Sequence, residues 1–188
     1  MLKYKVTTIP TIEPITASEA KLHCRITDSA DDAKIAELIT AAREYAETVT
    51  GQALAAQTIT AVCDSFPIGD RIRLPIGPIV TLTSAIYTDE TGSETNFTAD
   101  LAVDDFSEKP ELVLKPGKSW PSAALYPVNP IKIIYTAGAA PSKKTKSAML
   151  LLIGHWYENR EEVIAGQESF TVPFAAEALL QQERHTRT

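Results

Sequence analysis

The residues best spaced to do chemistry are His155, Glu158 and Glu162. Their i, i+3 and i+7 spacing places all three on one face of a helix. An imidazole and two carboxylates on one face could hold a divalent metal ion for hydrolysis. A helix this rich in charge produces such triples readily, so an interfacial histidine beside solvated glutamates is the favoured interpretation. A metal-dependent hydrolase stays open as an alternative.

Other signatures of catalysis are missing from the sequence. It contains no GxSxG, no phosphate-binding glycine loop and no HExxH, and His23 and His185 lie in unrelated contexts. Cys24 and Cys63 form no CxxC and no zinc-type spacing, which favours two free thiols in a reducing compartment. We therefore predict no catalytic residue, no metal and no cofactor.

Lys143, Lys144 and Lys146 precede the apolar run of the third predicted helix. Positive charge at a helix N-terminus opposes the helix dipole. The cluster is either a solvated surface patch or a contact for an acidic partner or phosphate. The negative net charge of the chain favours the solvated patch.

Four aromatic side chains could form a platform for stacking a base or a sugar: Trp120, Tyr126, Trp156 and Tyr157. Aromatic residues more often fill a core or an interface. We expect that second role here.

Composition excludes several classes. The chain has 188 residues, of which 44% are hydrophobic and 22% charged, as in an ordinary globular protein. Its net charge of -6 repels nucleic acid, so affinity for DNA is not the expected function. The longest apolar run, 148–154, is far shorter than the ~20 residues of a spanning helix, and residues 1–5 lack the apolar region of a signal peptide. We expect a cytosolic product with no membrane address.

Four helices are predicted, at about 17–26, 31–50, 142–164 and 174–184. Thr16 and Glu19 form a capping-box pattern before the first. The second has apolar residues at helical spacing and ends at Gly51, where a left-handed cap belongs. The third is apolar nearly all round, which indicates the centre of the core or a subunit interface.

Between the second and third helices, about 56–136, the sequence is typical of strands. Val, Ile and Thr alternate, and Pro and Gly recur between the runs. Strands are predicted at 58–62, 71–74, 79–87, 112–114 and 131–135. The predicted fold is α+β: a small bundle of about four helices with a strand-rich, mainly antiparallel insertion, forming a single domain over 1–188.

Several segments resemble the tailed-phage head-tail connector, or adaptor, proteins. The most specific is the run from Leu150 to Glu161, which contains His-Trp-Tyr-Glu-Asn-Arg-Glu, and the others are 15–21, 41–51, 117–121 and 131–138. The pieces 73–75 and 77–80 are similar to the longer, β-inserted members. The resemblance extends from about Ile15 to Leu180.

This resemblance implies a structural protein of a tailed phage or prophage and not an enzyme. Connectors of this kind form a ring, typically of about twelve subunits, below the portal protein. The ring extends the DNA channel, and DNA passes through it without sequence-specific binding. It also offers a docking surface for the stopper or tail. The implied location is the head-tail interface of the virion, with assembly in the host cytoplasm.

The resemblance also implies site residues. In the third helix, Leu151, Trp156, Tyr157, Asn159 and Arg160 are expected in the core or at a subunit contact, with Asn159 and Arg160 bonding a neighbour or capping the helix. The polar chain end, 178–188, is the candidate for docking on the portal protein, because such an end can order on a partner. The docking residues named there are Leu179, Leu180, Gln181 and Arg184.

Two further expectations remain open. The loops of the strand-rich segment are candidates for the tail-facing or outer surface. An acidic channel lining would let DNA slide, and the net charge suggests one here. A monomeric adaptor that binds a partner through the apolar third helix is the remaining alternative.

Overall fold

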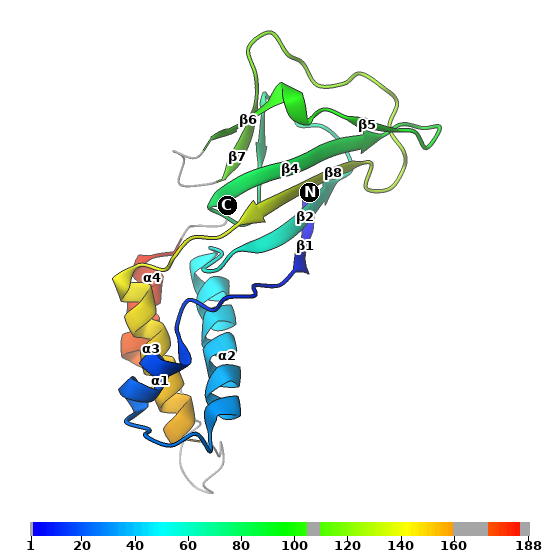
Figure 1. Cartoon of the computed structure of the whole chain (residues 1–188). Coiled ribbons are helices and arrows are strands. Elements are labelled where there is room, and N and C mark those ends of the chain that lie inside the picture. Colours follow the sequence, from blue (N-terminus) through cyan, green and yellow to red (C-terminus); the bar gives the residue numbers. More distant parts are fainter. Residues whose placement is uncertain (1, 105–109, 160–172, 185–188) are drawn as a thin grey trace, which may run out of the picture. The chain divides into compact units, whose positions relative to one another are not determined.

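The computed structural model describes residues 2–104, 110–159 and 173–184. The chain divides into two compact units (Figure 1). The helical unit comprises Ile12–Ala55 and Ala140–Thr186, and the β unit is built from Met1–Thr11 and Ala56–Ala139. The sequence pattern had led us to expect one domain over 1–188, with the strands as an insertion.

The helical unit contains α1 (Ala17–Cys24), α2 (Asp32–Thr50), α3 (Lys143–Glu158) and α4 (Phe174–Gln182). All four lie within the ranges predicted from the sequence. In the described residues α3 ends at Glu158, and Asn159 stands at its C-cap, where its N–H donates to the carbonyl of His155. Residues 160–164 of the predicted helix lie outside the described residues.

Local signals fix the helix ends. The Thr16 hydroxyl accepts from the Glu19 amide and the Glu19 carboxylate accepts from the Thr16 amide, as the capping-box pattern predicted. Gly51 caps α2 with φ of 74°, in the left-handed region that glycine tolerates best. The Ser142 hydroxyl accepts from the Thr145 amide and starts α3.

The core of the helical unit forms around α3, which packs against α1, α2 and α4. Its buried residues are Thr145, Ala148, Met149, Leu152 and Ile153. They meet a stripe on α2 formed by Ile35, Leu38, Ile39, Ala42 and Ala46. Having three helical neighbours within one subunit explains why the sequence of α3 is apolar nearly all round.

The β unit holds two antiparallel sheets. The larger has the order β1-β2-β8-β4-β5 and the smaller β3-β7-β6. Their strands are β1 (Lys3–Thr8), β2 (Gln57–Cys63), β3 (Arg71–Arg73), β4 (Ile79–Thr88), β5 (Glu94–Asn96), β6 (Leu101–Asp104), β7 (Glu111–Leu114) and β8 (Ile131–Ala137). A short 3-10 helix, Thr98–Asp100, precedes β6.

Alternation along the central strand β8 gives the β unit its core. Ile131, Ile133 and Tyr135 are buried on one face, and the residues between them are partly exposed. The Tyr135 hydroxyl donates to the carbonyl of Ile76, and burial raises the pKa of this phenol. A fixed register across β2 and β4 follows from burying this one face.

The α+β fold predicted from the sequence is confirmed. Three strands were missed: β1, β5 and β6. All six residues of β1 are exposed, although Tyr4 and Val6 alternate with polar residues in its sequence, and β5 consists of three exposed polar residues with no alternation. Because β1 pairs with β2, residues ahead of the first helix complete the sheet of the β unit.

Candidate assembly surfaces

The lysines at the start of α3 connect it to its neighbours. Lys146 Nζ lies 2.6 Å from Glu19 Oε1 on α1. Lys144 Nζ lies 3.4 Å from Gln182 Oε1 on α4 and 3.6 Å from Oε1 of Glu183 just beyond it. These contacts give two of the three predicted surface lysines a role inside the subunit.

Glu19 is a carboxylate whose pKa is strongly lowered by its neighbours. The hydrogen bond from Lys146, followed by those from the Thr16 amide and hydroxyl, lowers its pKa to about 2. One side chain therefore closes the N-terminus of α1 and holds that helix to α3. The carboxylate stays charged at any pH near neutrality.

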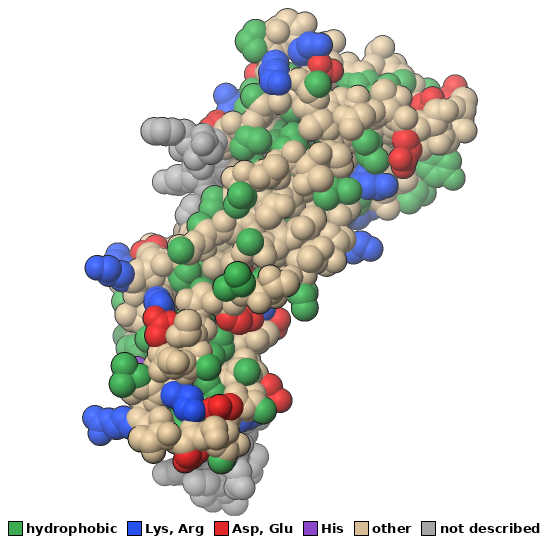
Figure 2. Space-filling model, viewed as in Figure 1, with side chains coloured by type: hydrophobic (Ala, Val, Ile, Leu, Met, Phe, Trp, Pro, Cys, Tyr) green, Lys and Arg blue, Asp and Glu red, His purple; other side chains and the backbone are tan. Residues whose placement is uncertain are grey.

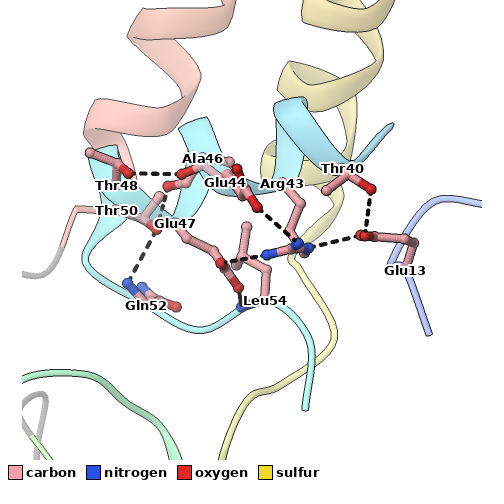
Figure 3. A network of polar contacts seen from close by, with 10 residues as sticks. All are labelled: Glu13, Thr40, Arg43, Glu44, Ala46, Glu47, Thr48, Thr50, Gln52 and Leu54. Carbon is pink, nitrogen blue, oxygen red and sulfur yellow. Dashed lines mark hydrogen bonds and ion pairs between the residues drawn. The ribbon is translucent and has the colours of Figure 1, made fainter. Parts of the chain in front are cut away.

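Arg43 on α2 is the centre of a buried ion network (Figure 3). Its Nε donates to Glu13 and its Nη1 to Glu47, each at 2.8 Å. Glu47 also accepts from the Leu54 amide, and Glu13 accepts from the hydroxyl of Thr40. Burial opposes the charge of Arg43, but the two carboxylates outweigh it and raise its pKa. The network fixes the chain where it enters α1 and where it leaves α2.

The residues singled out on α3 lie mainly inside their own subunit. Leu151, Trp156 and Tyr157 are partly buried and pack against the helical core. The Trp156 ring meets Tyr45 edge to face at 6.2 Å, and the Tyr157 hydroxyl donates to Asp31 at the start of α2. These contacts explain the three side chains by packing within their own subunit, which is one of the two roles predicted for them.

Asn159 and Arg160 are the two polar residues predicted to bond a neighbour or to cap the end of α3. The side-chain amide of Asn159 donates to the carbonyl of His155 at 2.8 Å, so it caps its own helix. Arg160 lies outside the described residues. The predicted contact of these residues with a neighbouring subunit stays a prediction.

The four residues near the chain end that are predicted to dock on the portal protein differ in how far they are buried. Leu180 is 0% exposed and belongs to the helical core, and Leu179 is partly buried against it. Gln181 and Arg184 are exposed. Docking that leaves the bundle intact can therefore use Gln181 and Arg184 but not Leu180.

Sequence reasoning missed three large exposed apolar side chains in the described part of the helical unit, of which Ile12 lies ahead of α1 and is 79% exposed. Leu22 on α1 is 81% exposed and Phe174 on α4 is 84% exposed. For Leu22 the capping residues Thr16 and Glu19 mark where α1 begins, without showing which side faces solvent. For Phe174 the sequence indicates only the start of a helix after Pro173, without showing which side faces solvent.

The aromatic residues form two separate groups. Trp120 stacks on Phe66 at 5.3 Å in the β unit, beside Tyr87 and Phe97, and Trp156 pairs with Tyr45 in the helical unit. Tyr126 is 47% exposed. Because Trp120 and Trp156 belong to different units, each ring is explained by packing in its own unit.

Of the three residues that could bind a metal ion, the structure describes His155 and Glu158. Nδ1 of His155 lies 3.3 Å from the side-chain amide of Asn159, Glu158 is exposed, and Glu162 lies outside the described residues. Within the described part of the chain no group of three His, Cys, Asp or Glu side chains could hold a metal ion. None of the described helices is long and apolar enough to cross a membrane.

Loops of the β unit expose further apolar side chains. Ile68 lies in the loop between β2 and β3, and Val128 and Tyr126 lie in the loop before β8. Figure 2 shows apolar side chains scattered over one face of the molecule, with few charged groups over the larger sheet. These loops are therefore free to contact another protein.

Comparison with known proteins shows which family and which solved structures the chain resembles. Residues 14–99 match the model of the Phage gp6-like head-tail connector protein family. No curated protein matches the chain.

Solved structures match over the whole chain. A chain in the virion of a native gene transfer agent particle is 26% identical, with a TM-score of 0.77 over 98% of this chain and 96% of that one. A chain in the neck of a native particle, computed with C12 symmetry, is 25% identical, with a TM-score of 0.75 over 100% and 97%. A chain in the neck of an empty particle, computed with C6 symmetry, is 24% identical, with a TM-score of 0.77 over 99% and 97%.

The resemblance noted in the sequence is thereby confirmed. Residues 14–99 carry the sequence pattern of the Phage gp6-like head-tail connector family, and the chain as a whole has the fold of a chain found in the neck of gene transfer agent particles.

Proposed function

We propose that this protein is a structural connector of a phage or phage-like particle. About twelve copies form a ring below the portal protein, extend the DNA channel and offer a docking surface to the stopper or tail protein. The protein is made in the host cytoplasm and becomes part of the virion neck. It carries out no catalysis.

The observation that carries this proposal is the full-length similarity to a neck chain from a particle computed with C12 symmetry. The family match over residues 14–99 supports it independently, because it rests on sequence alone. Together they favour a symmetric assembly in a virion over the monomeric adaptor.

The burial of α3 also weighs against that adaptor. Its mechanism needs an accessible apolar face on α3, but Met149, Leu152 and Ile153 are 0% exposed within the subunit. Contact with partners therefore falls to other surfaces. We assign portal docking to Gln181 on α4 and Arg184 just beyond its end, and stopper or tail docking to the β-unit loops that carry Ile68, Tyr126 and Val128.

The negative net charge of the chain is compatible with a channel through which DNA passes. At -6 the subunit repels the phosphate backbone and gains little from counterion release, so a duplex could slide without being held. DNA would pass with no sequence-specific contact. A basic channel lining in the assembled neck would contradict this part of the proposal.

Light scattering tests the proposal. The mass of the purified chain is measured alone and after mixing with the portal protein of the same particle. We expect a ring-sized species, either alone or bound to the portal. A chain that stays monomeric in both samples would refute a ring-forming connector.

The hydrolase alternative has its own test. Calorimetric titration of Zn²⁺ and Mg²⁺ into the full chain and into His155→Ala would show stoichiometric binding, lost in the variant, if His155 were a metal ligand. We expect no difference between the two proteins. A stoichiometric site lost in the variant would revive the hydrolase.

A further inference from the structure

Helices α1 and α4 lie on opposite sides of α3. Lys144 and Lys146 are two residues apart, which is about 200° around a helix, so their side chains leave α3 in opposite directions. Lys144 reaches the end of α4 and Lys146 reaches α1. In Figure 1, α1 passes in front of α3 and α4 lies behind it. The helical unit therefore has two different outer surfaces, one on each side.

The outer surface of α1 is centred on Leu22. The inner positions of α1 are occupied: Ala20 is buried, Lys21 pairs with Asp32 on α2, and His23 lies against Gly154 on α3. Leu22 points away from these contacts and is 81% exposed. Arg25, three residues later, is exposed as well.

The outer surface of α4 is centred on Phe174. Ala176 and Leu180 face the core and are 0% exposed. Phe174 is 84% exposed, and Glu177, three residues later, is exposed on the same side of the helix.

The two surfaces are complementary. Each has one large apolar side chain and, three residues later, one charged side chain, and the charges are opposite in sign. In the part of the chain that the structure describes, neither Arg25 nor Glu177 takes part in an ion pair. Leu22 and Phe174 each leave apolar surface in water that contact with another subunit would cover, and the two opposite charges beside them would attract each other across such a contact.

We propose that neighbouring copies of this chain meet head to tail through these two faces. Phe174 of one copy packs against Leu22 of the next, and Glu177 pairs with Arg25. Closed rings are built from heterologous contacts in which two different surfaces of each subunit meet, and surfaces on opposite sides of the unit satisfy this need. The inference rests on the proposed ring and names its contact residues.

The apolar pair and the charged pair have different roles. Phe174 and Leu22 bury surface that water covers in the free subunit, so they anchor the contact. The charged pair sits at the rim, where it adds little affinity but favours one orientation. Substitution at either apolar position should therefore weaken assembly more than loss of either charge.

Cysteine cross-linking tests the pairing directly. In a Cys24→Ser, Cys63→Ser background, the double variant Leu22→Cys, Phe174→Cys should form a ladder of covalent oligomers under mild oxidation. An equimolar mixture of the two single variants should stop at a 1:1 dimer, since each copy then has one reactive face. Single variants that dimerise with themselves, or a double variant that forms no ladder in an assembled sample, would overturn the proposal.

Charge exchange provides a second readout. We expect Arg25→Glu and Glu177→Arg each to reduce the yield of assembled species severalfold, and the double variant to restore it. Glu90→Arg, an exposed position in the β unit, is the matched control and should leave assembly unchanged. Loss in both single variants without rescue in the double variant would argue against a direct pair.

The design separates two kinds of failure. If wild-type rings form and neither cross-linking nor charge exchange affects these faces, the pairing is wrong and the connector role stands. If the wild-type chain assembles neither alone nor with the portal protein, the proposed function itself fails. Circular dichroism of each variant confirms that the exposed substitutions leave the fold intact.

Discussion

Glu19 at the first turn of α1 and Lys146 at the first turn of α3 lie 2.6 Å apart, although 127 residues separate them in the sequence. The contact joins the N-terminal part of the chain to the segment that follows the β unit. The same carboxylate completes the cap of α1. A single protonation therefore affects a helix end and a tertiary contact at once.

This arrangement predicts an acid-dependent loss of stability. The pKa of Glu19 falls from its ordinary 4.5 to about 2 in the folded chain. Because the folded-state pKa is the lower one, the stabilisation is complete above pH 4.5 and disappears as the pH falls toward 2. Urea unfolding of wild type and Glu19→Gln between pH 2 and 7 should show a difference in unfolding free energy that is largest near pH 7 and shrinks as the pH falls toward 2. Glu90→Gln is the control, and a constant difference would contradict the assignment.

Arg43→Met should destabilise the helical unit by about 3 kcal/mol, because it leaves the Glu13 and Glu47 carboxylates without their buried partner. Lys34→Met removes an exposed ion pair from the same helix and should cost less than about 1 kcal/mol. Chemical unfolding followed by far-UV circular dichroism measures both. Equal effects would mean that the buried network adds nothing beyond a surface pair.

Gly154→Ala tests how closely α1 approaches α3. A methyl group at Gly154 would lie 3.3 Å from two atoms of the His23 ring. His23 is exposed and can turn away, so the helix propensity of alanine should outweigh the crowding and stabilise by up to ~1 kcal/mol. The gain should be larger in a His23→Ala background, measured as a double-mutant cycle of thermal unfolding. A smaller gain in that background would show that the ring does not crowd the site.

Leu180→Ala and Gln181→Ala should separate folding from docking. Removing the buried Leu180 side chain should cost about 3 kcal/mol of unfolding free energy, since Leu180 is 0% exposed. Gln181→Ala should leave stability within about 0.5 kcal/mol and weaken binding to the portal protein. Unfolding curves and a portal pull-down give the two readouts. If Gln181→Ala and Arg184→Ala both bind the portal protein as tightly as wild type, the docking assignment is wrong.

Helices were predictable because their signals are local. Thr16 with Glu19, and Gly51, each mark a helix end within a few residues of the sequence, and the apolar spacing of α2 defines its buried stripe. The prediction carried α3 on to residue 164, and residues 160–164 lie outside the described part of the chain. Asn159 stops the helix through a side-chain bond to His155, which spacing does not reveal.

The ion pairs were not predictable from spacing, and strand β1 was overlooked although Tyr4 and Val6 alternate with polar residues. Lys3–Thr8 forms a strand only because β2 lies beside it, and every residue of β1 is exposed. The partners of Lys144 and Lys146 lie far away in the sequence, so the sequence alone favours a solvated surface patch for these lysines. Burial of Leu180 depends on the rotation of α4, which the sequence leaves open.

Electron microscopy of the chain mixed with the portal protein of its own particle tests the connector role most directly. The account predicts a ring of this protein, about twelve subunits, attached to one end of the portal assembly. Portal assemblies that stay bare at a saturating concentration of the chain, with no free rings in the field, would contradict it.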